Sequence, residues 1–233
     1  MPNPFSKEAP LSPAEQLRGI PLFAHLDPRE LREIGAAARE KSYPKNSVIL
    51  FEDDPGDALY VVLKGQVKVV LIGEDGREVI LSILKQGDFF GEMALIDDQP
   101  RSAHVIAMED SDLLVLHRDE FRKCLEETPR IALGLLQALS RRLRRADDKI
   151  GGLVLLDVNG RVARLLLELA DEHDGVQIPR KVTHHTIAQM IGSSRETVSR
   201  TIRDLGERGL IEVSRKTIVI RERAALEALA GLS

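Results

Sequence analysis

The chain has 233 residues, of which 43% are hydrophobic and 30% are charged, and its net charge is −4. These values are typical of a globular protein with one large domain or two small ones. Its single cysteine, Cys124, excludes an internal disulfide and a cysteine-ligated iron–sulfur cluster. The polar N-terminus is unlike a signal peptide, and no segment reaches the ~18 unbroken apolar residues of a membrane span. We therefore expect a cytoplasmic protein that does not contact membranes.

The net charge hides an asymmetry along the chain. Residues 1–140 hold 16 Lys and Arg against 24 Asp and Glu, whereas residues 141–233 hold 17 against 13. Attraction to DNA depends on a local basic patch and not on the total charge. The modest basic excess of the C-terminal part is therefore compatible with nucleic-acid binding.

The first 130 residues show two patterns in succession. Residues 13–41 are predicted to be helical, with Asp27 and Pro28 as the N-cap and first residue of a helix. Short β-rich runs separated by turn residues follow, at 48–51, 59–63, 67–72, 79–84, 104–107 and 113–116. Many short strands at this spacing favour an antiparallel barrel or jelly roll.

A heptad pattern of apolar residues follows Pro129. Its members are Ala132, Leu136, Leu139, Leu143, Ala146, Ile150 and Leu153. The spacing predicts a long helix that either forms a dimer seam or lies on the core of its own domain. We favour the seam, because dense charge beside the stripe keeps it narrow. Gly151–Gly152 and Asn159–Gly160 are expected to bracket a hinge.

The C-terminal part reads as a smaller α-rich domain. Helices are predicted near 160–172, 184–191 and 194–208, then a hairpin near 210–220 and a last helix from Arg223. Thr183 can cap the first helix of a helix-turn-helix, Gly192 permits the sharp turn, and Ser193 or Ser194 can cap the second helix.

The second of these helices presents a polar face. Val198, Ile202 and Leu205 should pack inward, and the outward residues are then Arg195, Glu196, Ser199, Arg200 and Arg203. In the major groove an arginine can bond to guanine and a glutamate can accept from the cytosine amino group. The alternative is a solvated face with a Glu196–Arg200 ion pair. The turn 214–217 resembles a wing and could contact phosphates, or be a plain surface turn.

Three motifs, in order, resemble the cyclic-AMP receptor protein / fumarate-nitrate regulator (CRP/FNR) family. They are the recognition-helix segment 191–200, the hinge segment 156–163, and the phosphate-binding cassette formed by 91–95 and 100–103. The resemblance covers nearly the whole chain from about residue 17. It implies an α+β protein with a cyclic-nucleotide-binding β-roll (15–130), a long dimerisation helix (131–156) and a winged helix-turn-helix (157–233).

The resemblance also implies a homodimeric transcription regulator that binds double-stranded DNA. Residues 132–153 would join the two copies, and RNA polymerase would be a further partner. The base-reading residues would be Arg195, Glu196 and Arg200, at a palindrome with TGTGA-like half-sites. The full DNA-binding set that we expect is Thr183, Ser193, Ser194, Arg195, Glu196, Ser199 and Arg200. Backbone contacts from His184 or His185, where the family carries other residues, are not implied.

The cassette implies an allosteric cyclic-nucleotide effector. Gly91 exposes backbone N–H groups, Arg101 and Ser102 can donate to a phosphate, and Glu92 can accept from a ribose hydroxyl. The expected ligand-binding set is Gly91, Glu92, Met93, Arg101, Ser102 and Ala103. A salt bridge between Glu92 and Arg101 in a ligand-free domain is the alternative.

The residues expected to contact the base do not identify the nucleotide. Where cyclic-AMP-binding members carry a Thr-Ser pair, this chain has Ala146 and Asp147. Asp147 can accept from the amino group of adenine or of guanine, or face solvent. Cyclic AMP is favoured, and cyclic GMP, cyclic di-GMP and a nucleotide-independent regulator are alternatives. A regulatory subunit without DNA binding and an enzyme are weaker readings, and no metal or covalent cofactor is expected.

Overall fold

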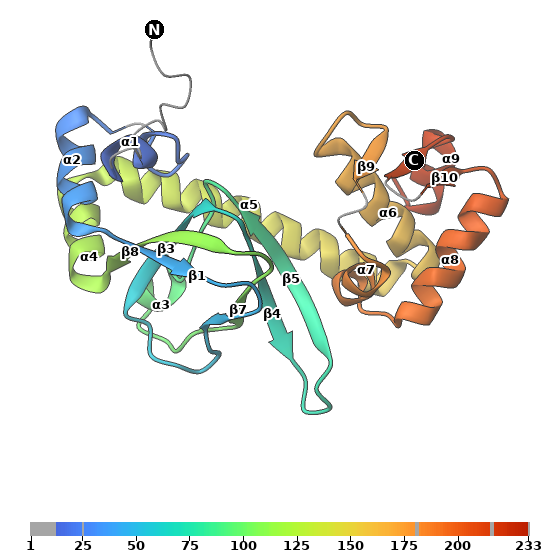
Figure 1. The fold of residues 1–233 in the computed structure, drawn as a ribbon, viewed down its shortest axis with the longest axis horizontal. Coiled ribbons are helices and arrows are strands. Elements are labelled where there is room, and N and C mark those ends of the chain that lie inside the picture. Colours follow the sequence, from blue (N-terminus) through green and yellow to red (C-terminus); the bar gives the residue numbers. More distant parts are fainter. Residues whose placement is uncertain (1–12, 25, 180–181, 215–216, 233) are drawn as a thin grey trace, which may run out of the picture. The chain divides into compact units, whose positions relative to one another are not determined.

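The computed structural model describes residues 13–24, 26–179, 182–214 and 217–232. The chain divides into two compact units (Figure 1). Within the described ranges, the first comprises the residues between 13 and 71 and between 82 and 141, and the second comprises those between 72 and 81 and between 142 and 232.

The first unit is a β-roll flanked by helices. Its helices are α1 (Pro13–Arg18), α2 (Pro28–Ala37), α3 (Met93–Ile96), α4 (Arg118–Glu127) and the start of α5 (Pro129–Leu155). The strands of the β-roll are β1 (Arg39–Tyr43), β2 (Val48–Leu50), β3 (Ala58–Lys64), β4 (Gln66–Ile72), β5 (Glu78–Lys85), β6 (Phe89–Phe90), β7 (His104–Ala107) and β8 (Ser111–His117). The last residue of β4 and the first half of β5 fall within the range 72–81 that is grouped with the second unit. They form two four-stranded sheets, in the orders β1-β8-β3-β6 and β2-β7-β4-β5. The expected antiparallel roll is confirmed.

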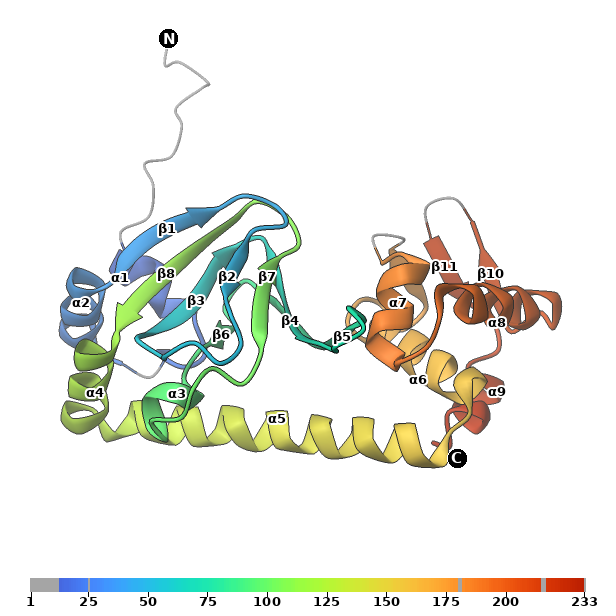
Figure 2. The same cartoon turned by 90° about the horizontal axis from the view of Figure 1, so that it is seen from below.

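The sheet that contains β3 and β8 is covered on both faces. In β3, Tyr60 and Val62 pack into the core between the two sheets, whereas Leu59 and Val61 pack against the flanking helices. Because both faces are buried, β3 is an almost unbroken apolar run and shows no alternation. The helices α2 and α4 lie on one side of this sheet (Figure 2).

The expected helical region over 13–41 contains two short helices, α1 and α2, separated by turns at 19–24, and the expectation is wrong in its last part. The helix α2 ends at Ala37, and residues 39–43 form β1, which pairs with β8 from Arg39 opposite Val115 to Tyr43 opposite Ser111. Four of the five residues of β1 are exposed, so the segment carries no apolar period that indicates a strand. The predicted cap at Asp27 is confirmed as a capping box, in which Asp27 accepts from the Glu30 N–H at 2.9 Å.

The break between the long helix and the next helix is shorter than the segment expected to form a hinge, and the hinge itself stays a prediction. The helix α5 runs without a break through Gly151 and Gly152 and ends at Leu155 (Figure 2). The helix α6 (Val158–Asp171) already includes Asn159 and Gly160 in its first turn. Asp157 caps α6 by accepting from the Gly160 N–H at 2.8 Å, which places the helix start before the expected hinge glycine.

The second unit is a winged helix-turn-helix. After α6 it contains β9 (Gln177–Pro179), α7 (His184–Ile191), α8 (Arg195–Glu207), β10 (Ile211–Val213), β11 (Thr217–Ile220) and α9 (Arg223–Leu229). The strands form one antiparallel sheet in the order β10-β11-β9. The predicted helices agree with the observed ones to within two residues. The short strand β9 was not predicted.

Candidate effector site and DNA-reading helix

The loop that follows β6 carries the predicted cassette. Gly91 has a positive φ of 84°, which glycine adopts without a steric penalty. A Cβ at this position would lie 2.6 Å from Nη1 of Arg101 and 2.9 Å from the carbonyl oxygen of Ala58. Only glycine therefore lets the backbone pass directly against the Arg101 guanidinium.

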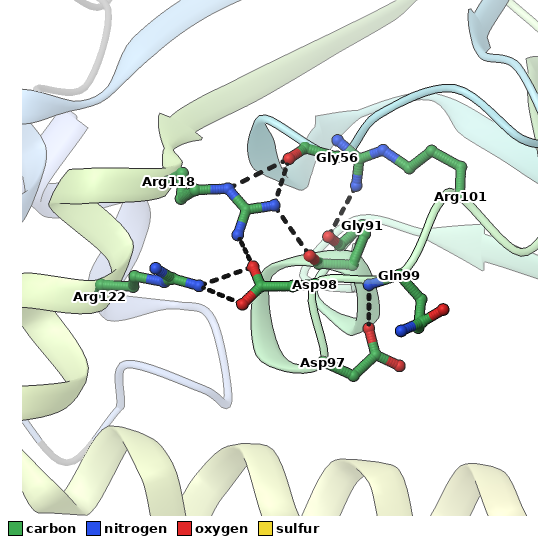
Figure 3. Close-up of polar contacts among 9 residues, drawn as sticks. Gly56, Gly91, Asp97, Asp98, Gln99, Arg101, Arg118 and Arg122 are labelled. Atoms are coloured by element: carbon green, nitrogen blue, oxygen red, sulfur yellow. Dashed lines mark hydrogen bonds and ion pairs between the residues drawn. The ribbon is translucent and has the colours of Figure 1, made fainter.

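Arg101 is buried, with 4% of its surface exposed. Its Nη1 donates to the carbonyl oxygen of Gly91 at 2.7 Å (Figure 3), and its Nη2 donates to that of Ala58 at 2.9 Å. The same Nη2 lies 3.3 Å from a carboxylate oxygen of Asp57. Among the residues that the structure describes, the buried Nε has no hydrogen-bond partner. The guanidinium is thus held in place, and its buried Nε–H is left for a further acceptor.

Two aromatic rings lie beside this guanidinium. The rings of Tyr60 and Phe90 are stacked, with centroids 5.2 Å apart and planes 8° apart. The Cζ atom of Arg101 lies 6.0 Å from the Tyr60 ring centroid, within the range of a cation–π contact. Burial raises the pKa of Tyr60 to about 12, so its phenol is neutral at physiological pH.

Sequence reasoning missed Asp57 and Tyr60. Asp57 directly precedes β3, and Tyr60 is the third residue of that strand. No sequence pattern links either residue to residue 101. They reach the cassette because β3 pairs with β6, with Tyr60 opposite Phe90. A Gly-Asp pair directly before a buried strand was the available signal.

The other predicted cassette residues lie in the same segment. Glu92 and Ala103 are buried, whereas Met93 and Ser102 are exposed. The Ser102 hydroxyl oxygen lies 4.0 Å from the Met93 sulfur. Together with the Arg101–Gly91 hydrogen bond, this contact joins the two halves of the cassette.

Asp147, the predicted contact of the base, lies on α5 and is exposed, as is its neighbour Ala146. It belongs to the second unit, whereas the cassette belongs to the first. Its role toward a ligand stays a prediction.

The predicted seam on α5 is largely uncovered. Leu136 is 61% exposed, Leu143 64%, Ile150 59% and Leu153 54%. A different stripe of α5 packs on the core of the first unit, including Ile131 and Leu135, and Leu139 of the heptad is also partly buried there. The helix therefore lies on its own core with one face and keeps a second apolar face exposed.

The helix-turn-helix forms as its residues predict. Thr183 caps α7 by accepting from the Thr186 N–H at 3.1 Å. Gly192 turns the chain with a left-handed φ of 64°. Of the two serines, Ser194 is the cap of α8, because its hydroxyl accepts from the Thr197 N–H at 3.1 Å.

The two faces of α8 also agree with the prediction. Val198, Ile202 and Leu205 are buried in the core of the second unit. Arg195, Glu196, Arg200 and Arg203 are exposed, and Ser193 and Ser199 are half-buried. The buried Thr201 holds α8 to α6 by donating to the Asn159 side chain at 2.9 Å. The charged face is thus presented by a firmly anchored helix.

The hairpin β10–β11 has the position of a wing. Ser214 closes its turn by accepting from the Thr217 N–H at 3.0 Å. Arg215 and Lys216, the basic residues of the predicted wing, lie outside the described residues.

Comparison with known proteins decides the family. Residues 40–128 match the cyclic nucleotide-binding domain family, and residues 160–229 match the Crp-like helix-turn-helix domain family. The "Cyclic AMP receptor protein" of Thermus thermophilus is 36% identical over 214 residues, which cover 92% of this chain and 98% of the relative. The chain belongs to the CRP/FNR family of transcription regulators.

Further relatives of this CRP/FNR protein differ in the effector that their names give. The "cAMP-activated global transcriptional regulator CRP" of Salmonella typhimurium is 38% identical over 183 residues, covering 76% of this chain and 87% of the relative. The solved structure of the c-di-GMP responsive global regulator CLP of Xanthomonas campestris superposes with a TM-score of 0.74 at 26% identity, covering 83% and 99% of the two chains.

These findings confirm the resemblance drawn from the sequence. The CRP/FNR protein is a DNA-binding transcription regulator with a cyclic nucleotide-binding domain, and it is not an enzyme. Within the described ranges, no helix has the length and hydropathy that crossing a membrane requires. The same ranges contain no group of three His, Cys, Asp or Glu side chains placed to hold a metal ion.

Proposed function

We propose that this regulator acts as a homodimer that reads a palindromic DNA site with TGTGA-like half-sites, and that a cyclic nucleotide controls this binding. The observation that carries the proposal is the exposed row of Arg195, Glu196 and Arg200 on α8. Arginine bonds in pairs to the two acceptors of guanine, and glutamate accepts from the cytosine amino group. This is the chemistry that a half-site with alternating G·C pairs requires.

A palindrome needs two copies of α8 about one DNA turn apart, ~34 Å. The exposed heptad residues of α5 support a dimer, because Leu143, Ile150 and Leu153 are each more than half exposed in the described chain. Pairing with the same stripe of a second copy would remove this apolar surface from water.

The buried Arg101 supports a phosphate-bearing effector. The Nε donor of Arg101 is unpaired in a buried position among the described residues, which is costly unless a ligand supplies an acceptor. A phosphate would accept from Arg101 and from Ser102, and the Glu92 carboxylate would accept from a ribose hydroxyl. Cyclic AMP is the first candidate, in agreement with the names of the Thermus thermophilus and Salmonella typhimurium relatives.

One feature of α5 supports a guanine nucleotide as the alternative effector. Ala146 offers no side-chain hydrogen bond to a base, and Asp147 is an acceptor that suits the N1–H and amino group of guanine as well as it suits adenine. Cyclic di-GMP and cyclic GMP are therefore the alternatives, and the Xanthomonas campestris relative is described as responsive to the former.

The nucleotide would control DNA binding by raising the fraction of dimers in the arrangement that binds DNA. The nucleotide must bind the DNA-competent arrangement of the dimer more tightly than the other arrangement. Once bound at its site, the dimer would meet RNA polymerase, the partner that the family resemblance implies.

The effector is tested by calorimetric titration of the full chain with cyclic AMP, cyclic GMP and cyclic di-GMP. We expect at least one of them to bind with Kd below ~100 μM, which corresponds to about 5.5 kcal/mol. If none does, the nucleotide switch is wrong, and DNA binding without nucleotide remains.

DNA reading is tested by gel-shift with a TGTGA-N6-TCACA duplex, with and without each nucleotide. A duplex of the same composition with scrambled half-sites is the control. We expect a specific complex whose affinity rises when the effector is present. Equal affinity for both duplexes would contradict base reading.

A further inference from the structure

The helix of the effector cassette cannot hold its own position. The helix α3 is a single turn of four residues, and its N-cap residue, Glu92, makes no capping hydrogen bond through its side chain. Fixing one isolated turn costs more backbone entropy than its hydrogen bonds return. Contacts from outside the turn must therefore position it.

Arg118, the first residue of α4, supplies such contacts (Figure 3). Its Nη2 donates to the carbonyl oxygen of Ala94 in α3 at 2.9 Å, and to that of Gly56 at 2.5 Å. Its Nε also donates to Gly56, at 3.2 Å, and its Nη1 pairs with the carboxylate of Asp98. One guanidinium thus joins α3, the turn after it and the loop before β3.

Asp98 is the second point of attachment. It has a left-handed φ of 56°, a conformation in which aspartate is tolerated better than most residues. Arg122, one turn further along α4, donates to both of its carboxylate oxygens, at 2.7 and 3.0 Å. The hydrogen bond from Arg118 holds the pKa of Asp98 below its ordinary value, so the carboxylate is charged at neutral pH.

The loop before β3, which Arg118 contacts, also carries acceptors of Arg101. The Arg118 backbone N–H donates to the carbonyl oxygen of Asp57 at 2.8 Å, and the next carbonyl, of Ala58, accepts from Arg101. A Cβ on Gly56 would lie only 2.3 Å from the Cβ of Ala94, so this loop and α3 already touch. Arg118 therefore bonds both to this loop, which leads to the acceptors Asp57 and Ala58, and to α3, which follows the acceptor Gly91.

We propose that Arg118 and Arg122 are positioning residues of the effector site: through Gly56, Ala94 and Asp98 they hold the cassette in the geometry that binds the nucleotide. Neither residue is proposed to touch the ligand. The proposal rests on the proposed function, because it requires that a nucleotide binds at the cassette.

The test measures Kd by calorimetry on the full chain, with whichever of cyclic AMP, cyclic GMP and cyclic di-GMP binds the unaltered protein. We expect Arg118→Met to weaken binding about tenfold, or about 1.4 kcal/mol. Arg118→Lys should not restore it, because a single ammonium cannot serve three acceptors in the plane of a guanidinium fork.

Milder variants distinguish an effect on the geometry of the cassette from an effect on the stability of the whole protein. Asp98→Asn removes the charge but keeps a residue that tolerates a left-handed φ, and we expect it to raise Kd about threefold. Adding Arg122→Gln to Asp98→Asn should raise Kd no further, because the two residues act as one pair. Lys123→Gln is the matched control on the same helix, since Lys123 pairs only distantly with Glu127, at 3.9 Å. Hydrogen exchange of amides 92–98 in the ligand-free protein should accelerate in Arg118→Met and not in the control.

The outcomes are distinct. If the unaltered chain binds nucleotide and both Arg118→Met and Asp98→Asn bind it within twofold of the same Kd, the positioning proposal is wrong and the proposed function stands. A fall in melting temperature without a change in Kd would also overturn it, because that is the effect of a purely structural contact. If the unaltered chain binds none of the three nucleotides, the proposed function fails and the positioning proposal fails with it.

Discussion

The candidate effector site and the exposed face of α8 both contain arginines, but they differ in how these arginines are held. In the β-roll, Arg101 is buried and its guanidinium is bonded to backbone carbonyls and to a carboxylate. On α8, Arg195 and Arg200 are exposed on a helix whose opposite face is anchored in the core. The position of Arg101 depends on contacts between segments that are distant in the chain, whereas the positions of Arg195 and Arg200 depend on a single helix.

The difference determines what a substitution does. A buried hydrogen-bonding group leaves unsatisfied partners behind when it is removed, so stability and ligand binding change together. An exposed side chain can be removed with little effect on stability, so only binding changes. The predictions that follow test this separation.

The largest effect is expected in the core that anchors α8. Leu205 is fully buried, and Leu205→Ala should cost about 2–5 kcal/mol of unfolding free energy through lost burial and a cavity. Urea unfolding followed by circular dichroism measures it. Arg203→Ala, an exposed neighbour on the same helix, should stay within about 0.5 kcal/mol. Similar losses for both variants would show that α8 is not anchored through this face.

Arg101→Met should act on both properties at once. We expect nucleotide affinity to fall at least about 100-fold, or about 2.7 kcal/mol. The carbonyl oxygens of Gly91 and Ala58 would lose a donor, so unfolding free energy should also fall by about 1–3 kcal/mol. Arg29→Met, at an exposed ion pair on α2, is the control for both measurements. Unchanged stability would mean that the carbonyls find other donors.

Arg195→Ala should change DNA binding alone. We expect a loss of about 1–3 kcal/mol at the TGTGA duplex and relaxed specificity at one base pair. The melting temperature should stay the same, because Arg195 is exposed. Gel-shift over a set of single-base variants measures it. A uniform loss over all sequences would indicate a phosphate contact.

Ser194→Ala should have a smaller, local effect on stability. Removing the N-cap of α8 should cost about 1 kcal/mol. Ser194→Asp should retain most of this stability, since aspartate is also a good cap. Ser193→Ala, one residue earlier, should leave the helix unchanged, and thermal unfolding compares the three variants. Equal losses at both serines would contradict the observed cap.

The smallest effect is a pH dependence at the capping box of α2. Hydrogen bonds from the backbone N–H groups of Glu30 and Arg29 lower the pKa of Asp27 below its ordinary value of 3.8. A carboxylate with a lowered pKa in the folded state stabilises the protein above its unfolded-state pKa. That contribution is lost as the pH falls through the folded-state pKa. The melting temperature of the unaltered chain should therefore exceed that of Asp27→Asn at pH 7, and the gap should close below 3.8. A gap that does not depend on pH would contradict this.

Much of the C-terminal module could be predicted from residues close together in the chain. The caps at Thr183 and Ser194 and the left-handed turn at Gly192 each depend on groups within one helical turn. The buried face of α8 follows from a helical period alone. Local chemistry is sufficient here because each feature involves only its near neighbours in sequence.

The effector site was predicted only in part for the opposite reason. Arg101 and Gly91 were found as a motif, but their partner Asp57 lies 44 residues before Arg101. Arg118 and Asp98, which hold α3, are 20 residues apart and belong to different elements. The strand β1 was missed because its charged residues become a strand only by pairing with β8.

Sequence alone was enough to identify the family, the caps and helical periods of the C-terminal module, the exposed polar face of α8 and the motif that contains Gly91 and Arg101. It was enough because these features depend on local periods, caps and motifs. Tertiary contacts were needed to establish that Arg101 lies among Asp57, Ala58 and Gly91. The physical reason is that the burial and hydrogen bonding of a polar group depend on segments that meet only when the β-roll closes.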